Sequence, residues 1–367
     1  MPSVFGGLMS GTSLDGVDCV IADFSAAVPH VYSATHLVFP AALKAELLAL
    51  QQPGANELDR SARAANALAD LYAEAVGAAL QAAGLTPGQI AALGAHGQTV
   101  RHQPKIVGKP GYTLQINNPA RLAETAGITV VADFRSRDVA AGGQGAPLVP
   151  AFHQAVFAHP TEHRVVLNLG GIANVTDLHP EHSVRGWDTG PANVLFDAWS
   201  MAQRGIAFDD EGHWAASGMP EDALLARLLA DPYFDLAPPK STGRDLFNLA
   251  WLALRLLGHE AAANVQATLL ALTAHSVAAS VKQHAGEPHQ IMVCGGGARN
   301  TALIKALQAC MPKSLVTRTS SAGFDEQHVE ALAFAWLARQ ALLGQPGNLP
   351  AVTGAAGPRV LGAIYPA

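Results

Sequence analysis

The residues from Met9 to Asp18 combine two glycines, three hydroxyls and two carboxylates in one short segment. The apolar runs on either side of it, 4–8 and 17–23, predict two buried strands. Glycines let main-chain amides approach a ligand, hydroxyls donate to phosphate oxygens, and carboxylates hold hydrated Mg²⁺. The turn therefore suits a nucleotide phosphate, although a hairpin turn of this composition also forms without any ligand.

Asp188 is the candidate catalytic carboxylate. It begins the sequence Asp-Thr-Gly-Pro, where we expect a strand to end in a turn and Pro191 to open a helix. A general base needs such a fixed position and contributes on the order of 10²–10⁴ in rate. The alternative is an Asx-turn that caps the following helix, and the local sequence favours neither over the other.

Several glycine-rich or polar turns follow predicted strands. In α/β proteins the carboxyl ends of the strands line the ligand crevice, so we expect these turns to converge. The late glycine run, 295–297, would let a flat purine and its ribose lie against the backbone. The turns are residues 10–16, 97–98, 170–171, 188–193 and 295–300.

Length and composition describe a globular enzyme. A chain of 367 residues is too long for one compact core, so we expect two domains. Apolar residues make up 49% and charged residues 14%, and the net charge of −6 is spread without blocks. This composition argues against a basic nucleic-acid surface and against a membrane-binding patch.

The cysteines and the hydropathy pattern predict a reduced, cytoplasmic protein. Three cysteines, none in a CxxC pair, indicate neither a disulfide framework nor a thiolate zinc site. We find no secretion signal and no apolar run long enough to span a membrane.

Helical and strand-like periods alternate along the chain, which predicts the α/β class. We expect helices over 58–83, 119–126, 191–205, 260–285 and 325–343, and strands over 91–95, 128–132, 165–169, 172–177 and 290–294. The glycine-rich passage 140–147 is typical of a linker or a mobile loop. We predict two domains. The first consists of residues 1–135 together with the tail 345–367, and the second of residues 136–344. The strand–turn–strand unit over 165–177 repeats the layout of the first hairpin, which suggests two related halves.

Familiar catalytic signatures are absent. The chain has no GxxxxGK[ST] phosphate loop, no GxSxG elbow and no HExxH metal motif. The segment 295–300 approaches GxGxxG but lies late in the chain, which argues against a dinucleotide-binding oxidoreductase.

Taken together, these motifs resemble those of the anhydro-N-acetylmuramic acid kinase family, in the sugar-kinase, actin and heat-shock ATPase superfamily. The resemblance extends from residue 4 to about residue 343. It implies two related domains of the actin/hexokinase-like ATPase fold with a cleft between them, and the use of ATP and Mg²⁺. The segments that carry it are 9–18, 96–99, 133–135, 168–174, 188–191 and 294–300.

The family resemblance implies an ATP-dependent conversion of 1,6-anhydro-N-acetylmuramic acid and water to N-acetylmuramic acid 6-phosphate, a step of peptidoglycan recycling. Asp188 would deprotonate the water that opens the anhydro bridge, while the freed O6 oxygen accepts the phosphoryl group. Mg²⁺ would lie near Asp15 or Asp18. The nucleotide would be held by Gly11, Thr12, Ser13, Leu14, Asp15, Gly16, Val17, Asp18, Gly170, Gly171, Gly295, Gly296, Gly297 and Asn300.

The sugar would contact His96, Gln98 and Glu330, and Arg135 and Arg137 are candidates for forked hydrogen bonds to its lactyl carboxylate. The arginines could instead form surface pairs with nearby aspartates. Two other functions are open: a plain sugar kinase that phosphorylates an intact hydroxyl, and a non-enzymatic actin- or chaperone-like nucleotide switch. The sequence leaves the oligomeric state open; a homodimer, the commonest assembly, is one possibility.

Overall fold

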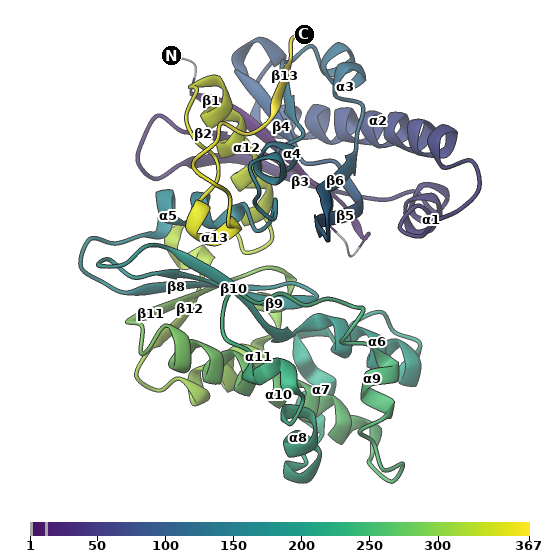
Figure 1. The fold of residues 1–367 in the computed structure, drawn as a ribbon, viewed down its shortest axis with the longest axis vertical. Coiled ribbons are helices and arrows are strands. Elements are labelled where there is room, and N and C mark those ends of the chain that lie inside the picture. The colour runs from purple at the N-terminus through teal and green to yellow at the C-terminus, as the bar shows by residue number, and fades with distance from the viewer. Residues whose placement is uncertain (1–2, 12–13) are drawn as a thin grey trace. The chain divides into compact units, whose positions relative to one another are not determined.

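The computed structural model describes residues 3–11 and 14–367. Contacts divide the chain into two units (Figure 1). Unit 1 consists of Met1–Val156 and His328–Ala367, and unit 2 is Phe157–Gln327. Thr12 and Ser13, two of the predicted phosphate-binding residues, lie outside the described residues.

Unit 1 contains a mixed six-stranded sheet in the order β13-β7-β4-β1-β2-β3. Strands β1, β4 and β7 are parallel to one another, and the other neighbours are antiparallel. The carboxyl ends of β1, β4 and β7 therefore meet at one edge. The strands are β1 (Val4–Met9), β2 (Gly16–Asp23), β3 (His30–Val38), β4 (Ala92–Ala95), β7 (Val130–Ala132) and β13 (Ala363–Tyr365).

Three helices of unit 1, α2, α3 and α12, lie where the sequence predicts helices, and the shorter helices α1, α4, α5 and α13 were not predicted. The long α2 ends at Gly84, which takes a left-handed conformation, and α3 begins with Asn118 as its side-chain cap. The helices are α1 (Ala41–Ala49), α2 (Glu57–Ala83), α3 (Pro119–Ala126), α4 (Ser136–Ala140), α12 (Val329–Leu342) and α13 (Pro350–Thr353), with α5 (Val149–Phe157) at the boundary.

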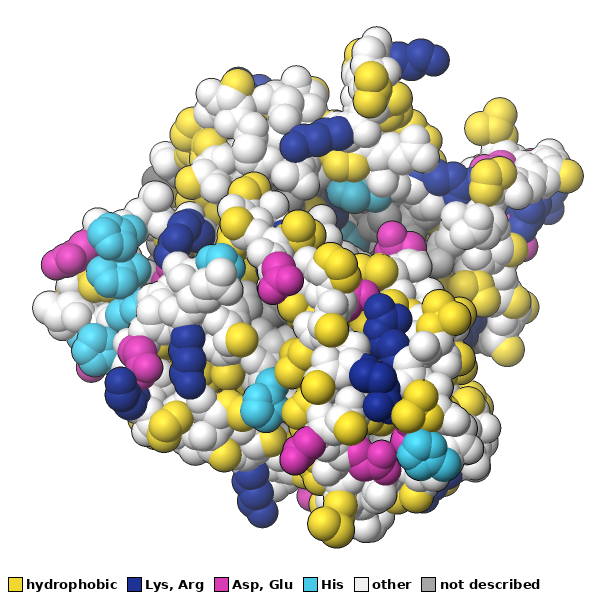
Figure 2. Space-filling view, turned by 60° about the horizontal axis from the view of Figure 1, so that its bottom comes forward, with side chains coloured by type: hydrophobic (Ala, Val, Ile, Leu, Met, Phe, Trp, Pro, Cys, Tyr) yellow, Lys and Arg dark blue, Asp and Glu magenta, His cyan; other side chains and the backbone are white. Residues whose placement is uncertain are grey.

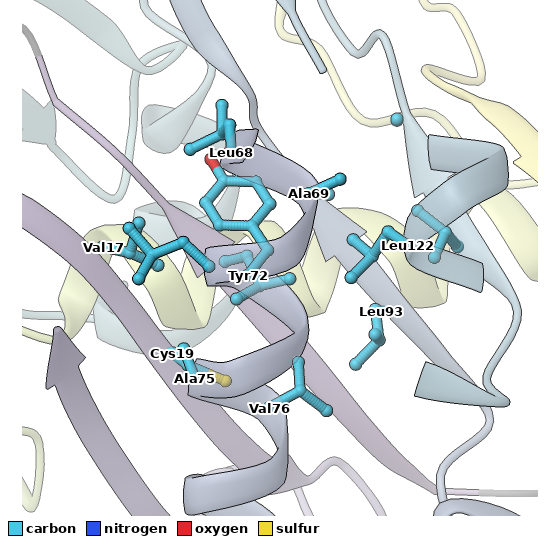
Figure 3. Packing of buried hydrophobic residues seen from close by; sticks show 14 of the residues in the cluster. Val17, Cys19, Leu68, Ala69, Tyr72, Ala75, Val76, Leu93 and Leu122 are labelled. Carbon is cyan, nitrogen blue, oxygen red and sulfur yellow. The ribbon is translucent and has the colours of Figure 1, made fainter. Parts of the chain in front are cut away.

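The core of unit 1 lies between its sheet and the helices α2 and α3. Figure 3 shows side chains from α2 facing others from β2, β4 and α3. The ring of Tyr72 is fully buried there. Burial of this apolar face is the main source of stability for α2, because isolated helices are marginal in water.

Unit 2 contains a five-stranded sheet in the order β10-β9-β8-β11-β12. Its β9-β8-β11-β12 portion has the strand directions of β2-β1-β4-β7 in unit 1: one antiparallel pair followed by two parallel pairs. The prediction of two related halves and an α/β fold is confirmed. The strands are β8 (Arg164–Leu169), β9 (Ile172–Leu178), β10 (Arg185–Pro191), β11 (Gln290–Cys294) and β12 (Leu315–Arg318).

The long helix α10 (Ala262–His284) organises the helices of unit 2. It packs against α6, α7, α8 and α11 as well as against β10. The other helices are α6 (Asn193–Arg204), α7 (His213–Ser217), α8 (Asp222–Leu229), α9 (Leu249–Ala253) and α11 (Thr301–Cys310).

The contact units differ from the predicted domains at both boundaries. Residues 136–156 and α12 belong to unit 1, whereas the predicted boundaries at 135 and 344 put them in the second domain. The physical reason is packing: α12 lies against β1, β2, β4 and β7. The hairpin of β5 (Gln98–Ile106) and β6 (Lys109–Ile116) was not predicted.

Basic and acidic side chains are interspersed on the face shown in Figure 2. Cys19, Cys294 and Cys310 are free thiols. Among the described residues, no helix is both long enough and apolar enough to cross a membrane.

Candidate active site

In unit 1, the turns that follow β1 and β4 are tied together. The hydroxyl of Ser10 donates to the carbonyl oxygen of Gly97 at 3.1 Å, and the side-chain amide of Gln98 donates to the carbonyl oxygen of Gly11 at 3.2 Å. Tyr72 is a buried residue of α2, and its hydroxyl lies 2.9 Å from Ser10 Oγ. Gln98 is fully buried. Its side chain therefore fixes the glycine turn in this structure.

The described part of the predicted phosphate-binding segment, Gly11 and residues 14–18, contains both exposed and buried residues. Asp15 is exposed, and its Oδ1 accepts from the amide of Gly16 at 3.0 Å. The side chains of Leu14 and Val17 are buried in the core, so only their main chain is available to a ligand.

Asp18 is partly buried, and its Oδ1 lies 2.8 Å from Nδ1 of His36. Burial raises the pKa of Asp18, the histidines His36 and His328 lower it, and the negative charge of Asp15 raises it further. Two carboxylates that repel each other suit a divalent cation. No group of three or more His, Cys, Asp or Glu within the described ranges could hold a metal ion. Mg²⁺ nonetheless fits, because it commonly binds one or two carboxylates together with phosphate oxygens and water.

Arg135 and His96 are joined by hydrogen bonds at this edge of the sheet. Arg135 Nε donates to Nε2 of His96 at 3.0 Å, and its Nη2 lies 2.9 Å from the same nitrogen. Its Nη1 donates to the carbonyl oxygen of Gly145 at 2.7 Å. Burial lowers the pKa of Arg135 to about 10, while the charges of Glu330 and Asp138 raise it, so the guanidinium stays cationic at neutral pH.

Glu330 is brought to this cluster by α12. Burial raises its pKa, Arg135 lowers it, and Asp18 and Asp15 raise it. The side chains of this cluster therefore influence one another electrostatically within unit 1. They are Asp15, Asp18, His96, Arg135 and Glu330. A hydroxyl-rich sugar would find both a strong acceptor and a strong donor here.

Two glycines of the sheet allow α12 to approach so closely. A Cβ at Gly7 would overlap the carbonyl oxygen of Ala331, and one at Gly94 would overlap that of Phe334. The backbone of α12 therefore lies directly on β1 and β4, which fixes the position of the helix and of Glu330 in its first turn.

Arg137 does not join this cluster. It is exposed and lines a pocket of about 470 Å³ together with Asp133, Ser136 and Arg359, and neither Arg135 nor Glu330 lines that pocket. The two candidate arginines therefore have different surroundings. Neither makes an ion pair with an aspartate among the described residues.

In unit 2, Asp188 lies within β10 rather than in a turn. The prediction that Pro191 opens a helix is wrong: Pro191 is the last residue of β10, and α6 starts at Asn193. The register with β9 shifts between Asp188 and Gly190. Such a bulge re-aims side chains at strand ends and often borders functional sites.

The segment 240–242 forms hydrogen bonds with both the main chain and the side chain of Asp188. The amide of Asp188 donates to the carbonyl oxygen of Lys240 at 3.0 Å, and the amide of Thr242 donates to Oδ2 of Asp188 at 3.0 Å. The hydroxyl of Tyr233 donates to the carbonyl oxygen of Asp188 at 2.9 Å. This network was not predicted, because residues more than forty positions away in the sequence provide it.

The electrostatic environment of Asp188 raises the pKa of its carboxyl group. Burial raises its pKa to about 6, while the hydrogen bond from Thr242 and the charge of Lys240 lower it. The predicted alternative, an Asx-turn that caps the next helix, does not describe the observed partner, which is Thr242. A carboxylate with a pKa near neutrality is well matched to general base catalysis.

The glycine turns of unit 2 meet at the ends of β8 and β11. Asn193 donates from Nδ2 to the carbonyl oxygen of Leu169 and from its amide to that of Gly170, each at 3.1 Å. Gly295 has a φ of 79°, and a Cβ at Gly297 would lie 2.7 Å from Cβ of Leu169. Gly170 and Gly171 are in contact with solvent, as is Gly296. The solvent-accessible glycines of these turns therefore form one polar surface built largely from backbone, whereas Gly297 is buried.

Asn300 caps α11. Its Oδ1 accepts from the amide of Leu303 at 2.9 Å, directly after the 3₁₀ turn Gly296–Arg299. A nucleotide contact through Asn300 would therefore use its side-chain nitrogen.

Comparison with solved structures supports the fold. Component A of (R)-2-hydroxyglutaryl-CoA dehydratase from Acidaminococcus fermentans aligns with a TM-score of 0.50 and 10% sequence identity. The alignment covers 91% of this chain and 96% of that one. At this identity the likeness concerns the fold alone.

Comparison of sequences is more specific. A model of the anhydro-N-acetylmuramic acid kinase family matches residues 3–367. Proteins named anhydro-N-acetylmuramic acid kinase from Cupriavidus pinatubonensis and Nitrosospira multiformis are 57% and 53% identical to this chain. Each alignment covers 98% of this chain, and they cover 97% and 98% of the two relatives. The chain belongs to the anhydro-N-acetylmuramic acid kinase family.

Proposed function

We propose that this protein is a phosphotransferase that converts 1,6-anhydro-N-acetylmuramic acid, ATP and water to N-acetylmuramic acid 6-phosphate and ADP, as a step of peptidoglycan recycling. The observation that carries the proposal is the environment of Asp188, a partly buried carboxylate whose pKa burial raises to about 6. We place the reaction in the cytoplasm, where ATP is available.

Asp188 acts as the general base for water in this proposal. One of its oxygens, Oδ2, accepts from Thr242, and Oδ1 accepts the proton of the attacking water. The water oxygen forms a bond to C1 of the sugar as the bond from C1 to the bridging oxygen breaks. The bridging oxygen, which stays on C6, takes the γ-phosphoryl group. Because phosphoryl transfer passes through a loose transition state, position and charge neutralisation supply most of its catalysis.

The nucleotide contacts follow the two sets of turns. In unit 1, the main chain of 11–18 would bind phosphates, with Asp15 and Asp18 as ligands of Mg²⁺. When bound, Mg²⁺ supplies charge neutralisation at the phosphates. In unit 2, the turns 170–171 and 295–297 would accept the adenosine, because their backbone surface lacks side chains.

The sugar contacts come from the cluster in unit 1. Glu330 would accept hydrogen bonds from the sugar, and Arg135 would bind its lactyl carboxylate, since the guanidinium is cationic and forms no ion pair with a carboxylate among the described residues. The oligomeric state stays open.

Isotope labelling separates this function from its alternatives. In ¹⁸O-water, product quenched after a single turnover should carry the label at C1 and none in its phosphate. A plain sugar kinase would leave no solvent oxygen on the sugar, and a nucleotide switch would consume ATP independently of the sugar. Because C1 of a free sugar exchanges slowly with water, unlabelled product incubated for the same time is the control.

A further inference from the structure

We propose that His96 is a positioning residue: its neutral imidazole orients the guanidinium of Arg135 and thereby gives the enzyme its selectivity for a sugar that carries a carboxylate. The proposal rests on the proposed function and assigns His96 a role other than direct contact with the sugar. The relevant residues all belong to unit 1.

The hydrogen bonds fix the protonation state of His96. Both Nε and Nη2 of Arg135 point to Nε2 of His96, at 3.0 Å and 2.9 Å. Since a guanidinium only donates, Nε2 must be the acceptor, and an imidazolium has no acceptor nitrogen. His96 is 5% exposed, and its burial and the charge of Arg135 hold its pKa well below the usual range, in agreement with the neutral form.

The ring of His96 is itself held in place. Its centroid lies 4.7 Å from that of Phe334, at an interplanar angle of 51°. Phe334 lies one helical turn after Glu330 on α12. The same helix face therefore carries the carboxylate of the cluster and the ring that supports His96.

A second contact holds the other side of the guanidinium. Nη1 of Arg135 donates to the carbonyl oxygen of Gly145, and the amide of Gly145 donates to Oδ2 of Asp138 at 2.7 Å. The other oxygen of Asp138 accepts from Asn348 at 2.6 Å and from Thr353 at 2.7 Å. The glycine-rich passage, predicted as a linker or a mobile loop, is thus tied to the C-terminal tail.

These contacts leave a specific part of Arg135 for the substrate. Of its five N–H groups, His96 and Gly145 take three, which leaves one N–H on each terminal nitrogen without an acceptor among residues 3–11 and 14–367. A carboxylate that spans the two terminal nitrogens accepts both bonds, and such forked pairs are strong and directional. A guanidinium released from His96 would lose this orientation.

A matched pair of substitutions tests the proposal. In His96→Gln the side-chain oxygen reaches about as far as Nε2 and can accept from Arg135, whereas in His96→Asn the amide is one methylene shorter. The readout is the ratio of kcat/KM for the anhydro-muramic acid to kcat/KM for anhydro-N-acetylglucosamine, which lacks the lactyl carboxylate. General damage lowers both values, so it leaves the ratio unchanged.

We expect the ratio to fall about tenfold or more in His96→Asn and to stay near the wild-type value in His96→Gln, with the KM for ATP unchanged in both. Phe334→Leu controls for packing, since it removes the ring contact but keeps the acceptor, and it should preserve the ratio. An unchanged ratio in His96→Asn, or an equal fall in both amide variants, would overturn the proposal. A wild-type protein that phosphorylates both sugars equally well would also overturn it. If the wild type phosphorylates neither, the proposed function itself fails.

Discussion

The amide of Thr242 donates a hydrogen bond to Oδ2 of Asp188 at 3.0 Å, across 54 positions of the sequence. The main-chain amide of Asp188 also donates a hydrogen bond to the carbonyl oxygen of Lys240. The segment 240–242 therefore holds Asp188 at two points, its main chain and its carboxylate. In the proposed role of Asp188 as the general base, a carboxylate fixed in this way would need little reorganisation when it accepts a proton.

The pH dependence of activity should show the titration of the Asp188 carboxyl group. Burial raises its pKa to about 6, and only the ionised form accepts a proton. As pH falls through this value the base becomes protonated, so kcat/KM should fall by about tenfold per pH unit below it and level off above it. A profile of kcat/KM with saturating ATP measures this. A value that stays constant from neutrality down to well below 6 would show that Asp188 is not the group that titrates.

In Lys240→Met, the fall of kcat/KM at low pH, which we call the acid limb of the profile, should begin at a higher pH. The charge of Lys240 lowers the pKa of Asp188, so its removal raises that pKa further. The matched control is Tyr233→Phe, which removes the hydrogen bond to the carbonyl oxygen of Asp188 but no cation. Its turnover should fall while the limb stays in place. Identical profiles for Lys240→Met and the wild type would contradict this account of the electrostatics.

Gly94→Ala should destabilise unit 1. The new Cβ would overlap the backbone of α12 at Phe334, and overpacking of this kind costs about 1–3 kcal/mol. Gly77→Ala is the control, since Gly77 is an exposed position inside α2 with open space around it, and this change should stabilise by about 0.5–1 kcal/mol. Urea unfolding followed by circular dichroism compares the two. Equal midpoints for both variants would mean that α12 does not need the close approach.

Local signals in the sequence predicted much of the fold. The caps of α2 and α3 follow from Gly84 and from Asn118 with Pro119, because these residues act through their own backbone geometry. The turn after β1 follows equally from its composition.

The supports of the candidate site could not be predicted in this way. The bulge in β10 depends on its pairing with β9, and Thr242 reaches Asp188 only in the folded unit. Likewise, Arg135 and Arg137 are two residues apart and look equivalent in sequence, but only Arg135 contacts His96. Such differences arise from tertiary contacts that a single sequence does not display.

The most direct test of the central claim is the turnover of Asp188→Asn, which keeps the shape of the side chain but removes the base. We predict that kcat falls on the order of 10³-fold while the affinity for ATP, measured by calorimetry, stays at the wild-type value. A variant that binds ATP and turns over the anhydro-sugar at the wild-type rate would contradict the assignment of Asp188 as the base.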